Sequence, residues 1–163
     1  MKRRALIAAV LLVALATGSV AAAIVWRSAT TNTTAEARLR NLIAAEHLRV
    51  CGVALAHDSR LTWMARYRST DMVLGRYFAH TNPVTGKRVF DLMAKAGIGY
   101  SRAAEILAWN TYPDDLSPGA AYKQFMSSSG HRSAIRACAC TRIGAGDYKV
   151  GSKRMYAVLL IKP

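Results

Sequence analysis

The sequence predicts an α+β domain in which helices cover a central, mainly antiparallel sheet. The first observation is a pair of segments with apolar residues at helical spacing, each followed by a glycine, Gly52 and Gly75. The second is a pair of strand-like runs near the C-terminus, residues 141–148 and 155–161, joined by a turn around residues 151–152. Helices that precede antiparallel strands, instead of alternating with parallel ones, favour the α+β class.

The N-terminus has the features of an export segment. Three basic residues precede residues 5–26, which carry no charge and could span a bilayer core, because that takes about 20 residues. Small residues at 21–23 offer a cleavage site, whereas the apolar residues 24–26 followed by Arg27 are typical of a membrane anchor. The expected division of the chain is a signal peptide or N-terminal membrane anchor at 1–27, a polar linker at 28–34, and an extracytoplasmic domain, secreted or anchored, at 35–163.

Charge and composition limit the partners. The chain of 163 residues has a formal net charge of +14, and all of its 9 acidic residues follow the uncharged run, as do most of its 23 basic ones. A surface of this sign attracts anions. Because the domain is expected outside the cytoplasm, we expect an anionic wall polymer, an anionic lipid or an acidic partner, and no nucleic acid. The apolar share of 52% provides a hydrophobic core and excludes a disordered chain.

Two long helices are expected in the first half of the domain. The first begins at a cap on Thr33 or Thr34 and ends at Gly52. Its predicted buried stripe consists of Leu39, Leu42, Ile43, Leu48 and Val50. The second begins at Asp58 or Ser59 and ends near Gly75. Its predicted buried side consists of Leu61, Met64, Ala65, Met72 and Leu74.

Loops and shorter helices are expected in the middle of the chain. Pro83 and Gly86 predict a loop over residues 77–88, after which a short apolar helix runs up to Gly97. A further helix is expected over residues 118–126, with a proline in its first turn.

The end of the domain combines a polar turn with the strands. Residues 127–133 are rich in Ser and Gly, and therefore predict a turn that holds His131 at a junction between helices. Residues 155–161 are almost wholly apolar, which predicts a central strand that is packed on both faces.

Three cysteines, Cys51, Cys138 and Cys140, are present. In an exported domain an even number of them can pair, so we expect a bridge between Cys51 and one of the two late cysteines. In the chain-entropy model such a long loop gives about 4 to 5 kcal/mol of stability. The alternative is three free, buried thiols. A zinc site on these cysteines is disfavoured, because a single residue separates Cys138 from Cys140.

His80, Glu105 and His131 are the candidate catalytic or metal-binding residues. Two histidines and a glutamate are ligand types that zinc accepts, with water in a remaining position. Glu105 is also a lone carboxylate in an apolar segment, which is costly unless it is paired or liganded. Their spacing matches no metal motif, so the alternative is a hydrogen-bonded polar cluster.

Other chemistry has less support. Serines 127–129 flank the last of these histidines, but no Gly-x-Ser-x-Gly elbow is present, so we interpret them as turn formers. No cysteine has a recognisable nucleophile context. His47 and His57 are interpreted as surface or packing residues, and Trp63 and Trp109 as core residues.

With these residues in this order, the chain resembles the CAP superfamily of cysteine-rich secretory proteins, antigen 5 and pathogenesis-related proteins. It resembles the bacterial SCP-like branch of that superfamily most. The resemblance runs from about Asn41 to Lys162. The residues that carry it are Asn41, Arg49, Gly52, Leu61, Ala65, Ser69, Asp71, Met72, Tyr77-Phe78-Ala79-His80, Ala96-Gly97-Ile98, Glu105, Ser128 through Arg132, Ile135 and Ile143-Gly144-x-Gly146.

This resemblance implies a three-layer α-β-α sandwich with a cleft where two histidines and one or two glutamates face one another. In some members the cleft holds zinc or another divalent cation. His80, Glu105 and His131 match three of the cleft positions. Cys51 and Cys138 match a cysteine pair of similar actinobacterial-type proteins, which would leave Cys140 free.

The chain also departs from the family pattern. The second cleft glutamate of animal and plant members has no counterpart, because residues 122–129 contain no acid. Phe125 replaces a common tryptophan, and Ile106 replaces the asparagine that often follows the first glutamate. At most three cleft ligands remain, so metal binding would be weaker or need water.

Three functions are compatible with these observations. The favoured one is a non-enzymatic extracytoplasmic binding protein with a His/Glu cleft that can hold a divalent metal, because no second acid is present to divide acid and base roles. The first alternative is a metal- or Glu105-assisted hydrolase that acts on protein or cell-wall substrate. The second is a lipid or sterol carrier.

Overall fold

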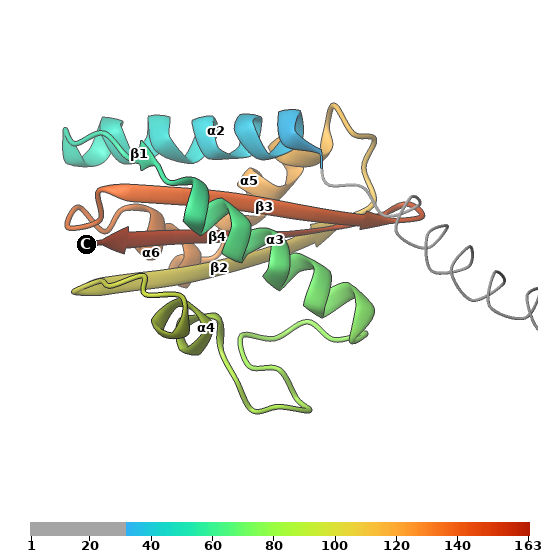
Figure 1. Ribbon diagram of the computed structural model, residues 1–163. Helices are drawn as coiled ribbons and strands as arrows, with labels where there is room; N and C mark the ends of the chain where they lie inside the picture. The colour runs from blue at the N-terminus through green and yellow to red at the C-terminus, as the bar shows by residue number, and fades with distance from the viewer. Residues whose placement is uncertain (1–31) are drawn as a thin grey trace, which may run out of the picture. The chain divides into compact units, whose positions relative to one another are not determined.

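The computed structural model describes residues 32–163, which form a three-layer α-β-α sandwich (Figure 1). The predicted α+β class and layer order are confirmed. The sheet lies in the middle, with α3 and α4 against one face and α2, α5 and α6 against the other. The elements are α2 (Thr33–Cys51), β1 (Ala56–His57), α3 (Ser59–Leu74), α4 (Val89–Lys95), β2 (Arg102–Asn110), α5 (Ser117–Ser127), α6 (Ser129–Ile135), β3 (Arg142–Val150) and β4 (Lys153–Lys162).

The four strands are arranged in the order β1-β3-β4-β2. Strand β4 lies between β3 and β2 and pairs antiparallel with both, while β1 pairs parallel with β3. The predicted central strand is therefore confirmed, and its apolar residues contact both helical layers. Within residues 32–163, strand β2 pairs only with β4, so its other edge is unpaired there.

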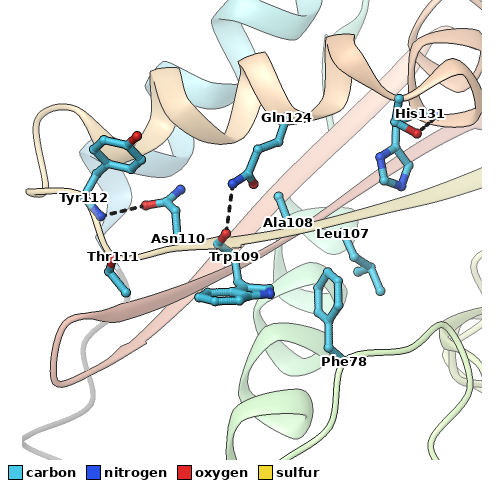
Figure 2. Close-up of a pocket in the computed structure, with 10 residues that line it drawn as sticks. Phe78, Leu107, Ala108, Trp109, Asn110, Thr111, Tyr112, Gln124 and His131 are labelled. Carbon is cyan, nitrogen blue, oxygen red and sulfur yellow. Dashed lines mark hydrogen bonds between the residues drawn. The ribbon is translucent and has the colours of Figure 1, made fainter.

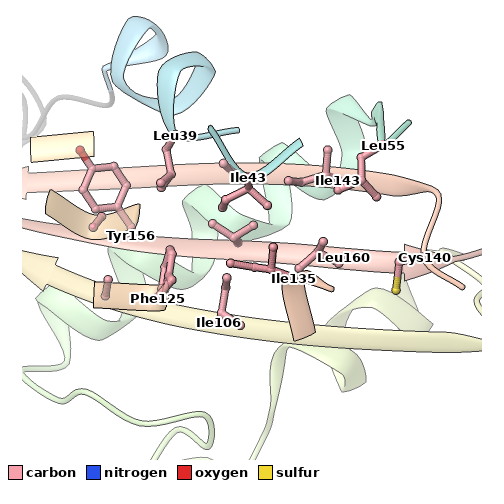
Figure 3. Close-up of a cluster of buried hydrophobic side chains, with 14 residues drawn as sticks. Leu39, Ile43, Leu55, Ile106, Phe125, Ile135, Cys140, Ile143, Tyr156 and Leu160 are labelled. Carbon is pink, nitrogen blue, oxygen red and sulfur yellow. The ribbon is translucent and has the colours of Figure 1, made fainter. Parts of the chain in front are cut away.

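Two separate hydrophobic clusters fill the spaces between the layers. One lies between the sheet and α2, α5 and α6, and includes Leu39, Phe125 and Tyr156 (Figure 3). The other lies under α3 and α4 and includes Met64, Met93 and Leu159. Neighbouring residues of β2 and β4 contribute to opposite clusters, as expected where side chains alternate across a strand.

Helix α2 is less apolar on its buried side than the sequence predicts. Its N-cap is Asn32, not Thr33 or Thr34, because the Asn32 side chain accepts hydrogen bonds from two backbone N–H groups of the first turn. Gly52 ends the helix at a φ of 66°, as predicted. Leu48 and Val50 are exposed, and two glutamates and a histidine are buried instead: Glu36, Glu46 and His47.

Helix α3 packs against β3 with unusual closeness. Of the two predicted caps, Asp58 and Ser59, the structure has Asp58, whereas Leu74 at the helix end is exposed and not buried. The helix backbone lies directly on Gly144 and Gly146 of β3, where a Cβ atom would overlap the backbone of α3. The Ser69 hydroxyl donates to the Gly146 carbonyl at 3.0 Å or to its own helix. The glycines are therefore required for the contact between helix and sheet.

The region around His131 is helical, which corrects the predicted turn. Ser128 lies in an extended conformation and caps α6, and its side chain accepts from the His131 N–H. His131 therefore lies inside the first turns of a short helix and not in a loop. The serines and glycine mark the boundary between α5 and α6 correctly, but a single non-helical residue, Ser128, separates the two helices.

A disulfide joins Cys51 at the end of α2 to Cys138 after α6, and Cys140 is free and buried. This is the pairing that the family resemblance implies. The expected signal peptide or anchor at 1–27 and most of the linker lie outside the described residues. Among residues 32–163, no helix has both the length and the hydrophobicity required to cross a membrane.

Candidate functional site

Glu105 is the buried centre of the candidate site. It lies on β2, and its side chain is 1% exposed. Arg68 Nε of α3 donates to one carboxylate oxygen at 3.1 Å, and His80 Nδ1 donates to the other at 2.7 Å. Because a carboxylate only accepts, His80 must carry a proton on Nδ1. Both Glu105 oxygens are thus engaged by this chain.

Arg68 connects Glu105 to the loop that carries His80. It is 2% exposed, and it donates to Asp71 Oδ2 at 3.0 Å, to the Tyr77 hydroxyl and to the Ala79 carbonyl. The Tyr77 hydroxyl also donates to Asp71, and burial together with that carboxylate raises the pKa of Tyr77 to about 12. The arginine therefore fixes the backbone immediately before His80.

His131 projects from α6 above β2, as Figure 2 shows. Its ring meets Phe125 edge-on, with ring centroids 5.4 Å apart. Burial, and after it the nearby His80, lower the pKa of His131. The imidazole is therefore neutral at physiological pH and keeps one acceptor nitrogen.

A pocket of about 460 Å³ lies along the free edge of β2, between α5 and α6 on one side and the loop of Phe78 on the other (Figure 2). The Gln124 side chain donates to the Trp109 carbonyl at 3.2 Å across this edge. The lining residues are Phe78, Leu107, Ala108, Trp109, Asn110, Thr111, Tyr112, Gln124, Ser128 and His131.

The structure brings the predicted residues together only in part. His80 and Glu105 are in contact, whereas His131 lines the neighbouring pocket, where the nearby His80 helps to lower the pKa of His131. Within residues 32–163, no group of three or more His, Cys, Asp or Glu side chains is arranged to hold a metal ion. The contacts of Glu105 explain this, because a buried guanidinium already neutralises its carboxylate and leaves the two imidazoles as the remaining ligand groups. The residues present do not fit a three-ligand zinc site.

Three aromatic residues of the pocket were missed or misjudged from the sequence. Phe78, Trp109 and Tyr112 are 47%, 43% and 54% exposed, so Trp109 is not the core residue that the sequence predicts, and neither is Trp63, at 60%. A signal was present: Trp109 and Tyr112 end a strand and begin a loop, where aromatic side chains often face solvent.

The remaining histidines have structural contacts, in agreement with their interpretation. His47 is buried and its Nδ1 lies 2.7 Å from the Ile135 carbonyl, which links α2 to α6. His57 Nε2 lies 3.0 Å from the Thr62 hydroxyl. Neither lines the pocket.

Comparisons with known proteins agree with this architecture. The model of the cysteine-rich secretory protein family, CAP, matches residues 32–161. The uncharacterized protein YkwD of Bacillus subtilis is 37% identical over 95 residues, which cover 58% of this chain and 35% of that protein. The chain thus spans about a third of the length of this relative.

Solved structures share the fold at lower identity. An extracellular protein with an SCP domain from Bacillus anthracis superposes with a TM-score of 0.67 at 24% identity, over 80% of this chain and 41% of that one. An outer surface protein of Borrelia burgdorferi gives a TM-score of 0.68 at 19% identity, over 80% and 93% of the two chains.

Proposed function

The chain belongs to the cysteine-rich secretory protein (CAP) family, and from this premise we propose that it is a non-enzymatic binding protein of the extracytoplasmic space. Its ligand site is the pocket along the free edge of β2. The cluster of Arg68, His80 and Glu105 holds one wall of this site in place. The chain is a bacterial CAP/SCP-like protein, and its ligand is a component of the cell envelope.

The engagement of Glu105 carries this proposal. A general base must lie within hydrogen-bond reach of the proton that it abstracts, directly or through one water. Here the two oxygens accept from a permanently charged arginine and from His80, and the side chain is 1% exposed. Such a carboxylate organises its surroundings and offers no base to a substrate. The pocket beside it is lined by aromatic and amide side chains, which suit binding.

The extracytoplasmic location has three supports. The uncharged N-terminal run is typical of export, and the disulfide is typical of an oxidising compartment. Two solved relatives are described as an extracellular and an outer surface protein. We propose that this chain is exported in the same way.

The experiment is sedimentation of the purified full-length chain with isolated bacterial cell envelopes. We expect Trp109→Ala and His131→Ala to lower the retained fraction about tenfold, since each removes a wall of the pocket. Trp63→Ala is the matched control, because Trp63 is an even more exposed tryptophan and lies outside this pocket. Retention that is equal in all four proteins would refute the pocket as the ligand site.

The alternatives are separated in the same preparation. Release of peptides or sugars from envelopes, abolished by Glu105→Gln, would establish a hydrolase and overturn the proposal. Lipid co-purifying with the chain in stoichiometric amount would indicate a carrier. For the metal, calorimetric titration with zinc should give equal heats for the native chain, His80→Ala and His131→Ala; heats lost in both variants would restore the metal centre.

A further inference from the structure

We propose that the pocket is the middle of a longer groove that binds a linear anionic polysaccharide. This inference rests on the proposed function and names the class of ligand for that site. It follows from the continuity of three cavities, from the charge of their lining and from the exposed aromatic rings between the charges.

Three cavities adjoin along one side of the domain. The central pocket shares Tyr112 and Gln124 with a second cavity of about 480 Å³ beside α5. It shares Phe78 with a third of about 390 Å³ at the end of α3. The floor of the central pocket, residues 107–110, alone extends about 10 Å at about 3.3 Å per residue. A ligand that fills all three must be a chain molecule.

All the charged residues that line the three cavities are basic. Arg76 and Lys153 line one end, and Arg38 and Lys123 line the other. No Asp or Glu lines any of the three cavities in the described part of the chain. None of the four cations has a carboxylate partner among residues 32–163, although most carboxylates there do pair with Arg or Lys. The groove therefore presents unpaired positive charge at both ends.

Aromatic rings lie between these charges. Phe78, Trp109 and Tyr112 are each about half exposed, which leaves ring faces open to a ligand. Lys153 Nζ lies 4.5 Å from the centre of the Trp109 ring, so one aromatic surface and one cation act at the same place. Flat apolar rings stack on the carbon faces of sugar rings, and the neighbouring amide and hydroxyl groups of Gln124 and Thr111 can bind sugar hydroxyls.

Arg76 occupies a backbone position that normally selects glycine. Its φ is 55°, the one positive value at a non-glycine residue between 32 and 163. It follows α3 where the Tyr77 N–H donates back to the Met72 carbonyl at 3.0 Å, a helix end that favours Gly in the left-handed region. An arginine there costs about 1 kcal/mol. The positive charge that Arg76 brings to the end of the groove is a reason to retain arginine at this position.

A sugar chain fits this groove better than a peptide. A peptide would be expected to add to the free edge of β2, but the Gln124 amide already occupies the Trp109 carbonyl on that edge. A lipid tail needs an enclosed apolar cavity, whereas the aromatic walls here are half exposed and the two ends of the groove are basic. Acidic sugars offer both flat rings and regularly spaced anions.

The test is calorimetric titration of the full-length chain with three probes at about 0.15 M salt. The probes are polygalacturonate, its methyl-esterified neutral form and poly-L-glutamate. We expect polygalacturonate to bind about tenfold or more tightly than either of the others, since only it has both rings and charge. If poly-L-glutamate bound as tightly as polygalacturonate, the polysaccharide proposal would be refuted and an acidic peptide would be indicated as the ligand.

Variants separate the groove from general attraction between opposite charges. Lys123→Gln/Lys153→Gln removes one cation from each end, and Lys87→Gln/Lys162→Gln removes two exposed, unpaired lysines outside the cavities. We expect the first pair to weaken binding about tenfold more than the second. Arg76→Gly should also weaken binding while leaving the melting temperature unchanged or higher. Equal losses in the two lysine pairs would refute the groove.

The outcomes distinguish this inference from the proposed function. Envelope retention that depends on Trp109 without binding of polygalacturonate would refute the polysaccharide and leave the binding function intact. Loss of envelope retention altogether would remove the proposed function itself.

Discussion

Arg68 is the residue on which the candidate site depends most. It contacts groups from α3, from β2 and from the loop after α3, and it is buried on all sides. An arginine can do this because its guanidinium has five donors in a fixed plane and stays charged when buried. The position of His80 beside Glu105 is therefore a consequence of Arg68.

Replacement of Arg68 by methionine should destabilise the domain strongly. The change leaves Glu105 buried with one oxygen unpaired, so we expect a loss of about 3 to 5 kcal/mol in the free energy of unfolding in urea. Arg60→Met is the control, because Arg60 is 62% exposed in its pair with Asp58, and its loss should cost about 1 kcal/mol or less. Adding Glu105→Gln to Arg68→Met should recover part of the loss. Equal stability of the two single variants would contradict this account.

His131 should titrate below the usual range of histidine. Burial lowers its pKa below 6.5, and the charge of His80 lowers it further. A lowered pKa in the folded state means that the stability contributed by this group is present above pH 6.5 and is lost as the pH falls through the folded pKa. Titration of the ring C–H signals by NMR should show this value, and His80→Gln should raise it. A pKa above 6.5 would indicate an acidic partner of His131.

The sequence predicts which residues belong to this site better than it predicts which of them touch one another. His80, Glu105 and His131 could be identified from their order and from the family resemblance. Arg68 could not, because its buried partner Glu105 lies 37 residues away in the sequence, and on its helix Arg68 is one arginine among several. Trp109 was misjudged because hydrophobicity alone does not tell the covered face of an edge strand from the exposed one.

At the level of elements, the contact between α3 and β3 fixes one helical layer on the sheet. Glycines at 144 and 146 allow the helix backbone to approach the strand without an intervening side chain. This approach sets the depth of α3, and Arg68 lies on the same helix. The distance between α3 and β2, which Arg68 bridges, therefore depends indirectly on these glycines.

Gly146→Ala should displace α3 and destabilise the domain by about 3 kcal/mol, because the new methyl group overlaps the backbone of Ala65 and Arg66. Gly119→Ala is the control. Gly119 lies in α5 with nothing within 4 Å of an added Cβ, and alanine there should be neutral or stabilising by up to about 1 kcal/mol. Thermal unfolding checks both variants. A melting temperature of Gly146→Ala equal to that of the native chain would contradict the close contact.

Element boundaries could be predicted where capping residues are explicit. Asp58 and Gly52 were identified as helix ends for the correct physical reason. The start of the short helix α6 was placed too late, after His131, because Ser and Gly in its first turn gave the appearance of a polar loop. The strand β2 was equally hard to assign, since a short apolar run is compatible with either element until its partner strand is known.

At the scale of the whole molecule, paired charges stabilise the fold, whereas unpaired cations are available to bind a ligand. The carboxylates of α2, α3 and β3 pair with arginines inside the domain, and so neutralise only part of the positive charge. The cations that remain unpaired include those of the groove. A net charge of this size attracts polyanions from a distance, and the groove then selects among them.

The disulfide connects the C-terminal end of α2 to the segment that follows α6. Cys51 and Cys138 are 87 residues apart in sequence, so the bridge closes a long loop that contains β1, α3, α4, β2, α5 and α6. In the chain-entropy model such a loop restricts the unfolded chain and stabilises the fold by about 4 to 5 kcal/mol. Because α6 also carries His131, the bridge limits how far that wall of the pocket can open.

Cys51→Ser/Cys138→Ser should therefore unfold at a much lower urea concentration, with the free energy of unfolding reduced by about 4 kcal/mol. Cys140→Ala is the control for the loss of a cysteine, and it should cost less because it opens no loop. Burial raises the pKa of the Cys140 thiol, so alkylation of the native chain should be slow, and denaturation without reductant should expose one reactive thiol. Three labelled cysteines under those conditions would disprove the bridge, and one labelled cysteine together with an unchanged stability of the double variant would disprove its role in holding α6 against α2.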